Sequence, residues 1–239
     1  MERMRLNKYL AHCGVCSRRE ADRLIGQGRV EVNGCPAVSG QTVDGTDEVT
    51  VSGKAVHRRE KTVVLAYYKP MGVTCTEKDP HADKKLTDMI KYPVRVTYAG
   101  RLDKDSEGLL LLTNDGDLIQ AMMRGSHHHE KEYIVRVDRE ITEGFLNQME
   151  HGIYLEDLEV TTKPCKAEKI GRFTFKLILT QGLNRQIRRM CSACGYRVKG
   201  LKRVRVMHIK LGNLKSGEYV ELSNEDVERL YRDAGLEPV

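Results

Sequence analysis

Residues 100–117 read GRLDKDSEGLLLLTNDGD and set an acid, Asp103, beside an arginine and in front of an uninterrupted apolar run. A glycine precedes the run Leu109–Leu112 and an Asn-Asp-Gly turn follows it, so the pattern predicts a short buried strand. Asp103 then lies on a loop that leads into the core. An isolated Gly-x-x-Asp would indicate only a turn aspartate. A carboxylate at the entrance to the core needs a partner or a chemical role, because an unpaired buried charge is costly.

Segments on either side of this stretch carry further strand and helix signals. Alternation or apolar runs predict strands at 63–68, 130–137, 173–179 and 201–211. Pro70 ends the first strand, because proline lacks the N–H that a neighbouring strand needs. Helices are predicted at 117–123, from a cap at Asn184 to Gly195, and from a cap at Ser223 to Tyr231. This mixture indicates an α+β domain.

The N-terminal residues form a separate group of elements. Apolar residues recur at helical spacing from residue 6, and Ser17 with Glu20 makes a capping box for a second helix. The dipeptide Asn33-Gly34 predicts a hairpin in the small sheet that follows. Residues 57–61 are charged and unpatterned, which suits a linker. We therefore expect two domains, 1–61 and 62–239.

The charge of the chain is modest overall but uneven along the sequence. The 239 residues include 40 Lys or Arg and 34 Asp or Glu, a formal charge of +6. Between Gln181 and Lys210 there are nine basic residues and no acid. Such a cluster repels itself unless a polyanion is near, which favours nucleic acid over a merely solvated basic face. No apolar run reaches the length of a membrane span and no signal peptide is found, so we expect a cytoplasmic protein.

The cysteines and histidines give little reason to expect a metal. Seven scattered cysteines favour reduced thiols. Cys13–Cys16 and Cys191–Cys194 have the spacing of zinc knuckles, but they fall in different predicted domains, so ordinary thiols are favoured. Residues 127–129 are three histidines in a loop without other ligands nearby.

The N-terminal domain resembles a known RNA-binding module. The pattern L-x-x-Y-L-A-x-x-G-x-x-S-R-R-E-A-D-x-L-I-x-x-G-x-V-x-V-N-G runs from Leu6 to Gly34 and looks like an S4 domain. The resemblance implies phosphate contacts from Lys8, Arg18, Arg19 and Arg23. The alternative is that these side chains only solvate an exposed helix face. S4 domains occur on many translation proteins, so the motif indicates RNA binding rather than a reaction.

The stretch at 100–117 is similar to motif II of the RsuA/RluB/RluE/RluF family of ribosomal RNA pseudouridine synthases. The family's catalytic aspartate corresponds to Asp103. Motif I, usually N-K-P-x-G, matches at Lys69, but Tyr68 replaces the asparagine. The resemblance implies that Lys69 contacts RNA. Motif III, G-x-x-R-Q-I-R-R-M, implies Arg188 as the partner of Asp103, and it implies RNA-phosphate contacts from Arg185 and Arg189. The family fold is a mixed, mainly antiparallel β-sheet flanked by helices.

The implied reaction breaks the N1–C1′ bond of a uridine, turns the base and joins C5 to C1′. No group enters or leaves overall, so no cofactor is expected. The carboxylate could attack C1′ or remove the C2′ proton, and the sequence leaves both routes open. The base must first flip out, and the resemblance implies Tyr133 as the aromatic wall of its pocket. Arg101 is expected to fill the space left in the RNA, and Leu201 to line the pocket.

Segments 129–133 and 180–191 look most like the RluF branch, whose members act on 23S ribosomal RNA. We expect ribosomal RNA as the partner, tRNA as a possible additional substrate, and a monomer. Two other functions remain open. A non-catalytic S4 assembly factor would not need Asp103. A glycoside hydrolase needs a second carboxylate at the place where motif III offers Arg188.

Overall fold

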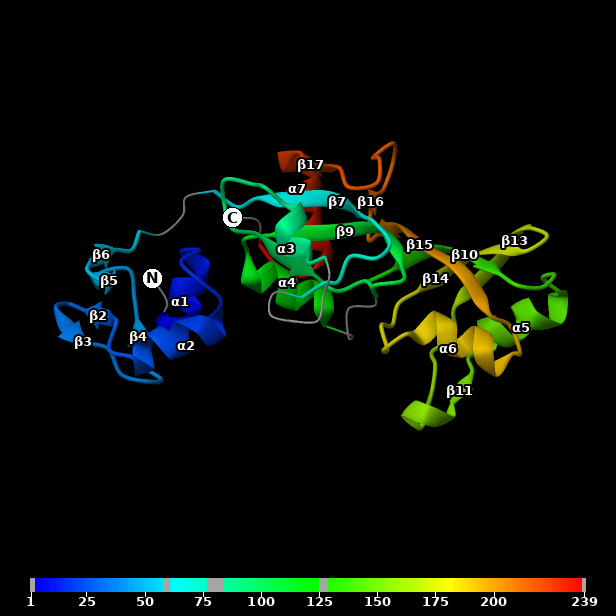
Figure 1. Ribbon diagram of the computed structural model, residues 1–239, viewed down its shortest axis with the longest axis horizontal. Coiled ribbons are helices and arrows are strands. Elements are labelled where there is room, and N and C mark those ends of the chain that lie inside the picture. Colours follow the sequence, from blue (N-terminus) through cyan, green and yellow to red (C-terminus); the bar gives the residue numbers. More distant parts are fainter. Residues whose placement is uncertain (1–2, 58–60, 77–83, 125–128, 238–239) are drawn as a thin grey trace. The chain divides into compact units, whose positions relative to one another are not determined.

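The computed structural model describes residues 3–57, 61–76, 84–124 and 129–237. Part of the expected linker, 58–60, and His127 and His128 lie outside the described residues. The chain forms two compact units (Figure 1). One comprises Met1–Val63 with Tyr92–Val96 and Asn114–Gly116, and the other comprises the remaining residues. No helix in the described part of the chain is both long enough and apolar enough to cross a bilayer.

The first unit holds two short helices and a small sheet. Its elements are α1 (Leu6–His12), α2 (Arg18–Gly26), β1 (Met4–Arg5), β2 (Val30–Val32), β3 (Cys35–Pro36), β4 (Thr42–Val43), β5 (Val49–Val51) and β6 (Lys54–Ala55). The sheet order is β3-β2-β5-β6, and β1 pairs with β4. Ser17 accepts a hydrogen bond from the Glu20 backbone N–H at 3.3 Å, which confirms the predicted helix cap. Asn33 and Gly34 have φ angles of 53° and 76°, the backbone of a type I′ hairpin turn.

The second unit is built on one large sheet. Its strands are β7 (Val64–Lys69), β8 (Thr97–Ala99), β9 (Glu107–Thr113), β10 (Lys131–Val137), β13 (Lys166–Gly171), β14 (Thr174–Leu179), β15 (Val198–Val206), β16 (Ile209–Lys210) and β17 (Tyr219–Glu221). The order is β13-β14-β10-β15-β9-β7-β17, with β16 on β15 and β8 on β9. Every pairing is antiparallel except that of β9 with β15. The expected mixed, mainly antiparallel sheet is confirmed.

Helices cover both halves of this sheet. They are α3 (Leu86–Met89), α4 (Gly116–Met123), α5 (Glu143–His151), α6 (Gln186–Ala193) and α7 (Asn224–Asp233), and a short hairpin joins β11 (Tyr154–Leu155) to β12 (Val160–Thr161). Leu118 of α4 and Leu230 of α7 join Leu111 of β9 in one buried cluster. On the other half, Phe145 of α5 meets Phe175 of β14 edge to face, with ring centroids 5.2 Å apart.

The two halves of the sheet meet where β9 pairs with β15 in parallel over a short stretch, a contact called here the crossing. The described register has two residue pairs, Lys202 with Glu107 and Arg203 with Gly108. Gly108 has a φ of +109°, and a Cβ atom on it would lie 2.2 Å from the carbonyl oxygen of Arg203. Only glycine fits such a position, because it has no side chain and tolerates positive φ. The loop that carries Asp103 enters β9 directly before this crossing.

Two local predictions were wrong. The segment 201–211 is not one strand but the end of β15, a tight turn and β16, because Met207 takes the left-handed backbone with a φ of 53°. Asn184 does not cap α6. The residue at the cap position is Arg185, with φ 50° and ψ 31°, while Gly195 follows the helix end as expected, with a φ of 78°.

The crossing of β9 and β15 gives a stability prediction. Gly108→Ala should lower the free energy of unfolding by about 2–4 kcal/mol, because it adds both a steric clash and backbone strain. Urea unfolding followed by circular dichroism measures this change. Gly200→Ala, also on β15, is the control, because its Cβ would meet Arg136 Cβ at an ordinary 3.7 Å. Equal stability of the two variants would show that the close approach at Gly108 is unimportant.

Candidate active site

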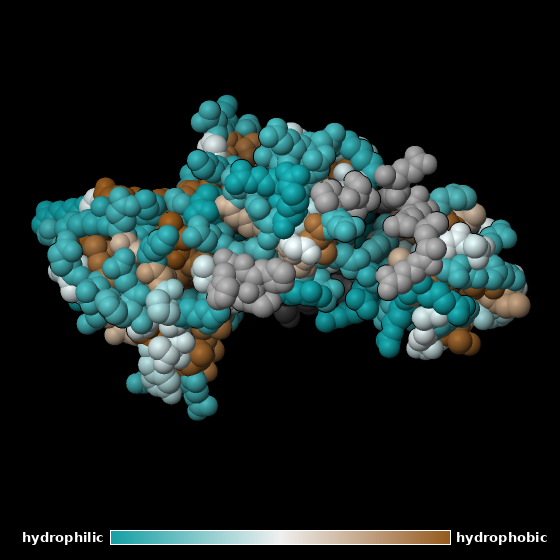
Figure 2. Space-filling view, turned by 180° about the vertical axis from the view of Figure 1, so that it is seen from behind, coloured by the Kyte–Doolittle hydropathy of each residue, from teal (hydrophilic) through white to brown (hydrophobic). Residues whose placement is uncertain are grey.

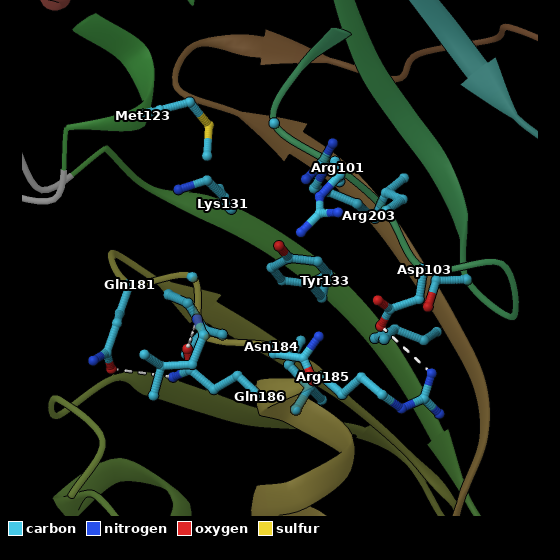
Figure 3. A pocket seen from close by; sticks show the side chains of 18 of the residues that line it. Arg101, Asp103, Met123, Lys131, Tyr133, Gln181, Asn184, Arg185, Gln186 and Arg203 are labelled. Atoms are coloured by element: carbon cyan, nitrogen blue, oxygen red, sulfur yellow. Dashed lines mark hydrogen bonds and ion pairs between the residues drawn. The ribbon is translucent and has the colours of Figure 1, made fainter. Parts of the chain in front are cut away.

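A cavity of about 770 Å³ opens beside the crossing of β9 and β15. Its walls come from β10, β15, the loop before β9 and the loop before α6, as Figure 3 shows. Five of the residues singled out from the sequence line it, namely Arg101, Asp103, Tyr133, Arg185 and Leu201. Segments far apart in the chain therefore converge on one pocket.

Asp103 lies on the loop between β8 and β9, with 34% of its side chain exposed. Its Oδ2 atom is 3.8 Å from Nη1 of Arg185. The expected partner was Arg188, and that expectation was wrong: among the described residues, Arg185 is the arginine that pairs with Asp103. The reason is that α6 begins only at Gln186, so Arg185 lies ahead of the helix on a left-handed backbone and reaches the loop.

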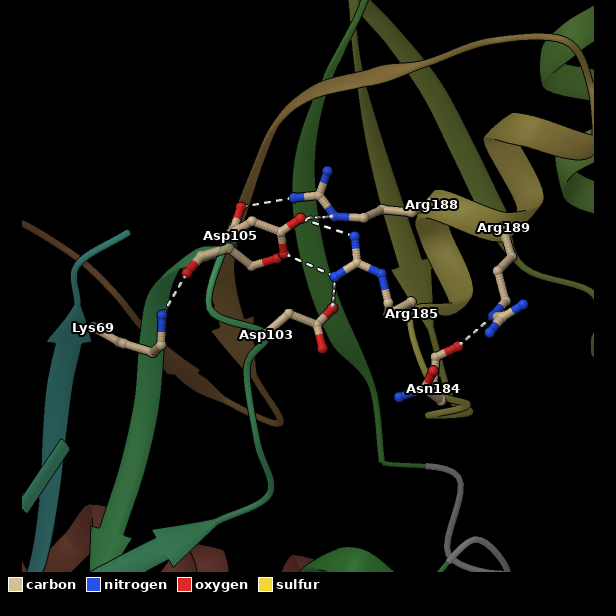
Figure 4. A network of polar contacts seen from close by, with 8 residues as sticks. Lys69, Asp103, Asp105, Asn184, Arg185, Arg188 and Arg189 are labelled. Atoms are coloured by element: carbon tan, nitrogen blue, oxygen red, sulfur yellow. Dashed lines mark hydrogen bonds and ion pairs between the residues drawn. The ribbon is translucent and has the colours of Figure 1, made fainter. Parts of the chain in front are cut away.

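A second acid of the same loop, Asp105, holds two arginines. Arg185 donates to both of its carboxylate oxygens, at 3.1 and 2.9 Å (Figure 4). Nε of Arg188 lies 3.2 Å from Asp105 Oδ2, and the same guanidinium donates to the Asp105 carbonyl at 2.7 Å. The hydrogen bonds from Arg185 are the main reason that the pKa of Asp105 lies below its ordinary 3.8, with Arg188 adding to the effect and burial opposing it. Asp105 was missed from sequence, although it stands two residues after Asp103.

Lys69 lies beneath the Asp103 loop, where it is fully buried. Its Nζ donates to the carbonyl oxygens of Pro70, at 2.9 Å, and Ser106, at 2.7 Å. Burial lowers the pKa of Lys69, and the nearby Cys75, Asp103 and Asp105 oppose that shift. The expected contact of Lys69 with RNA was therefore wrong. Lys69 ends β7, which lies between β9 and β17 in the sheet, and its side chain is buried in the interior.

Tyr133 of β10 lines the cavity and is 9% exposed. Figure 3 draws its ring below Arg101 and to the left of Asp103, which line the same cavity. Arg203, which pairs with Tyr133 across the sheet, is 3% exposed and donates to the Leu109 carbonyl at 2.8 Å. Lys131 also lines the cavity, and burial lowers its pKa, with Arg203 adding to the effect.

Arg203 and Lys131 were not singled out from the sequence. The available signal was strand parity, because Arg203 shares a strand face with Leu201 and Lys131 shares one with Tyr133. Another missed residue is Gln186, the first residue of α6. Its side chain is buried, accepts a hydrogen bond from the Leu183 N–H at 3.0 Å, and so fixes the loop before α6.

The basic stretch 181–210 is partly neutralised by acids that are distant in sequence. Arg189 pairs with Asp157 and also donates to the Asn184 carbonyl at 3.1 Å. Arg205 pairs with Glu130 and with Glu132, both at 2.9 Å. The expectation that these charges need an external polyanion was therefore too simple.

The residues singled out in the first unit lie on its two helices. Arg18 and Arg19 are exposed, whereas Lys8 is half-buried. Arg23 is exposed and pairs with Glu20 on the same helix. The two Cys-x-x-Cys pairs fall in different units, and Cys13 and Cys191 are buried as free thiols.

The pocket therefore offers a carboxylate with a guanidinium beside it, an aromatic wall and several further cations. A carboxylate in this setting can act as a base or as a nucleophile. The tyrosine ring can support a flat ring of a ligand. The cations suit a ligand that carries negative charge.

Asp105 gives a prediction about pH. Because its folded-state pKa is lowered, its contribution to stability is present above pH 3.8 and is lost as the pH falls below that value. Asp105→Asn should cost about 1 kcal/mol at pH 7, a modest value because the pairs are partly exposed, and the difference from wild type should shrink as the pH falls below 3.8. Urea unfolding across this pH range measures it. Glu237→Gln is the control for removing one exposed negative charge, and a gap that stays constant with pH would contradict the pairing.

Known proteins match both parts of the chain. Residues 63–193 match the family model for RNA pseudouridylate synthase, and residues 4–49 match the S4 domain. Dual-specificity RNA pseudouridine synthase RluF of Escherichia coli (strain K12) is 45% identical over 231 residues, which cover 96% of this chain and 79% of that protein. Ribosomal large subunit pseudouridine synthase B of Bacillus subtilis (strain 168) is 39% identical over 234 residues, 95% of each chain.

A crystal structure of a pseudouridylate synthase has the same fold. It aligns with a TM-score of 0.70 at 30% identity and covers 95% of this chain and 99% of its own. The matched segments include the Asp103 loop, β10 and all of α6, which contribute to the cavity together with β15. The chain therefore belongs to the RNA pseudouridine synthase family and carries an S4 domain at its N-terminus.

Proposed function

We propose that this RNA pseudouridine synthase isomerises one uridine of 23S ribosomal RNA, with Asp103 acting at the ribose. The observation that carries the proposal is the position of Asp103, a carboxylate that lines the same cavity of about 770 Å³ as Tyr133. The Bacillus subtilis relative is named for the large ribosomal subunit, which supports a 23S target. The Escherichia coli relative is named as dual-specific, and we propose tRNA as a second substrate here.

The residues around Asp103 are assigned roles by their positions. Arg185, 3.8 Å away, places a positive charge beside the carboxylate while the C1′–N1 bond changes. Tyr133 supplies the surface on which the flipped base rests, an interaction of about 1–3 kcal/mol for a stacked base. Arg101, in the loop before β9, fills the space that the flipped uridine leaves in the RNA. Leu201 lines the pocket.

The second acid of the loop argues against a glycoside hydrolase. Such enzymes use one carboxyl group as a general acid, which requires a raised pKa. The pKa of Asp105 is instead lowered, because Arg185 donates two hydrogen bonds to it. Asp105 therefore stays ionised and supports the site by holding arginines.

The S4 domain, which we place at residues 1–61, supplies a second contact with RNA. Arg18 and Arg19 lie exposed at the start of α2, where the helix dipole adds to their positive charge, and Arg23 follows one turn later. Lys8 of α1 is assigned to the same surface, and Arg189 is assigned to the RNA surface of the larger domain. With ribosomal RNA as substrate, we place the protein in the cytoplasm. We propose a monomer, because the face in Figure 2 is mostly hydrophilic and shows apolar residues in small separate groups.

The role of Asp103 gives a direct prediction. Asp103→Asn should lower turnover by at least about 10²–10⁴-fold, because the amide can neither attack C1′ nor remove the C2′ proton. RNA affinity should change less than about twofold. Release of tritium from C5-labelled uridine measures turnover, and fluorescence anisotropy measures binding. Asp88→Asn is the control carboxylate. If the Asp103→Asn enzyme still turns over at a tenth of the normal rate, Asp103 is not the catalyst.

The S4 assignment gives a second prediction. Arg18→Ala with Arg19→Ala should weaken RNA binding and reduce the magnitude of the log–log salt slope by roughly 0.7–0.9 for each phosphate that is no longer neutralised. Turnover at saturating RNA should be unchanged. Lys54→Ala removes an exposed cation from β6 and serves as control. A double variant whose slope equals that of the control would mean that these arginines do not contact phosphates.

A further inference from the structure

A second cavity, of about 430 Å³, lies against the N-terminal part of α6. Arg185 lines both cavities. The second one, called here the arginine cavity, has four arginines in its wall from separate parts of the fold: Arg139 after β10, Arg185 and Arg188 at α6, and Arg197 between α6 and β15. No residue singled out for catalysis, apart from the two at α6, contributes to it.

The wall of the arginine cavity keeps an excess of positive charge. Asp138 is the acid among its lining residues. That carboxylate already accepts the Arg197 backbone N–H at 2.8 Å and lies 3.8 Å from Nε of Arg139. Arg185 and Arg188 share Asp105, which reaches them from the active-site loop. Arg185 also lies 3.8 Å from Asp103. Four guanidinium groups thus face three carboxylates, Asp138, Asp105 and Asp103, which leaves one positive charge for an anion.

The shape of the wall selects charge rather than a nucleobase. Tyr196 is the one aromatic residue among the described residues that line the cavity. Its ring carries the Arg139 guanidinium 5.4 Å from the centroid and packs on Phe145, with centroids 4.1 Å apart. A ring packed in this way cannot offer a free platform for a base. The guanidinium groups, in contrast, present forked donors that match phosphate oxygens.

We propose that the arginine cavity binds backbone phosphate of the RNA strand that carries the target uridine. The proposal rests on the proposed function, because an RNA nucleotide at Asp103 must have neighbours in the strand. Arg185 lines both cavities, so a strand with its uridine at Asp103 continues past Arg185 to Arg139 and Arg197. Phosphate contacts of this kind position the strand and do not read its sequence.

The test uses the full-length protein and an RNA hairpin containing the uridine. Arg139→Ala combined with Arg197→Ala removes the two cavity arginines that lie outside the active site. Arg229→Ala on α7 is a matched control: Arg229 exposes 59% of its side chain and lies 3.7 Å from Asp233, while Arg139 exposes 60% and lies 3.8 Å from Asp138. Thermal melts establish that each variant is folded.

The double variant should bind RNA more weakly, with a salt slope smaller in magnitude by roughly 0.7–0.9 for each phosphate left without its arginine. The ratio of the variant's Kd to the wild-type Kd should therefore shrink between 50 and 200 mM salt. The decrease should be about threefold for each lost phosphate contact. Turnover at saturating RNA should equal that of wild type, while KM rises. Hairpins of different loop sequence should lose affinity equally.

Charge-keeping variants separate a binding role from a structural one. Arg139→Lys with Arg197→Lys retains both charges but loses the forks and the stacking on Tyr196. If the cavity binds phosphate, the lysine pair restores the salt slope of wild type. If the arginines only brace Tyr196 and Asp138, the lysine pair behaves as the alanine pair does in the thermal melt, and neither changes the slope.

Several outcomes would overturn the proposal. One is an alanine pair that binds RNA as tightly and with the same salt slope as Arg229→Ala. Another is inorganic phosphate at low concentration raising the melting temperature through Arg139 and Arg197, with no effect of these residues on RNA affinity, which would indicate a site for a small phosphorylated molecule. A wild-type protein that binds RNA through these arginines but makes no pseudouridine would refute the proposed function, and with it the placement of a target uridine at Asp103, while phosphate binding by the arginine cavity would still be observed.

Discussion

The architecture of the catalytic unit depends on one close approach of backbones, that of Gly108 to Arg203. Strands β9 and β15 can cross there because residue 108 has no Cβ atom, which would otherwise lie 2.2 Å from a carbonyl oxygen. The crossing joins two halves of the sheet that carry different parts of the site: the Asp103 loop enters β9, while Tyr133 stands on β10, next to β15. The position of the carboxylate relative to the aromatic wall follows from this contact.

Two buried cations then fix the chain around the crossing. Lys69 from β7 holds the carbonyl of Ser106, and Arg203 from β15 holds the carbonyl of Leu109. Because removing a cation from water is unfavourable, these contacts add little to overall stability. They place the base of the Asp103 loop by bonds to its backbone, which leaves the loop's own side chains available for chemistry. Asp105 adds the third anchor, through Arg185 and Arg188.

Local pattern predicted the elements well and the partners poorly. Ser17 and Glu20, the Asn33-Gly34 turn and the buried run at 109–112 each reflect forces that act within a few residues, and all appear as expected. The left-handed backbone of Arg185 and the turn at Met207 depend on tertiary packing, which overrides local preference. The pairing of Arg185 with Asp105 spans 80 residues, and no local periodicity encodes it. The family motifs located Asp103 and its pocket but did not show which arginine reaches it.

The forked contact between Arg185 and Asp105 has a consequence for how the enzyme meets its substrate. A free arginine side chain has up to about 2 kcal/mol of rotamer entropy to lose on becoming fixed. Here that freedom is given up when the protein folds, because a carboxylate of its own chain holds the guanidinium with two hydrogen bonds. The Arg185 side chain is therefore ordered before RNA binds. Its affinity for an anion is reduced little by the entropy cost of immobilising a long side chain. Folding stability and substrate affinity are in this way linked through one residue pair. A change that frees Arg185 from Asp105 should therefore weaken RNA binding, because the arginine must then be immobilised when the RNA binds.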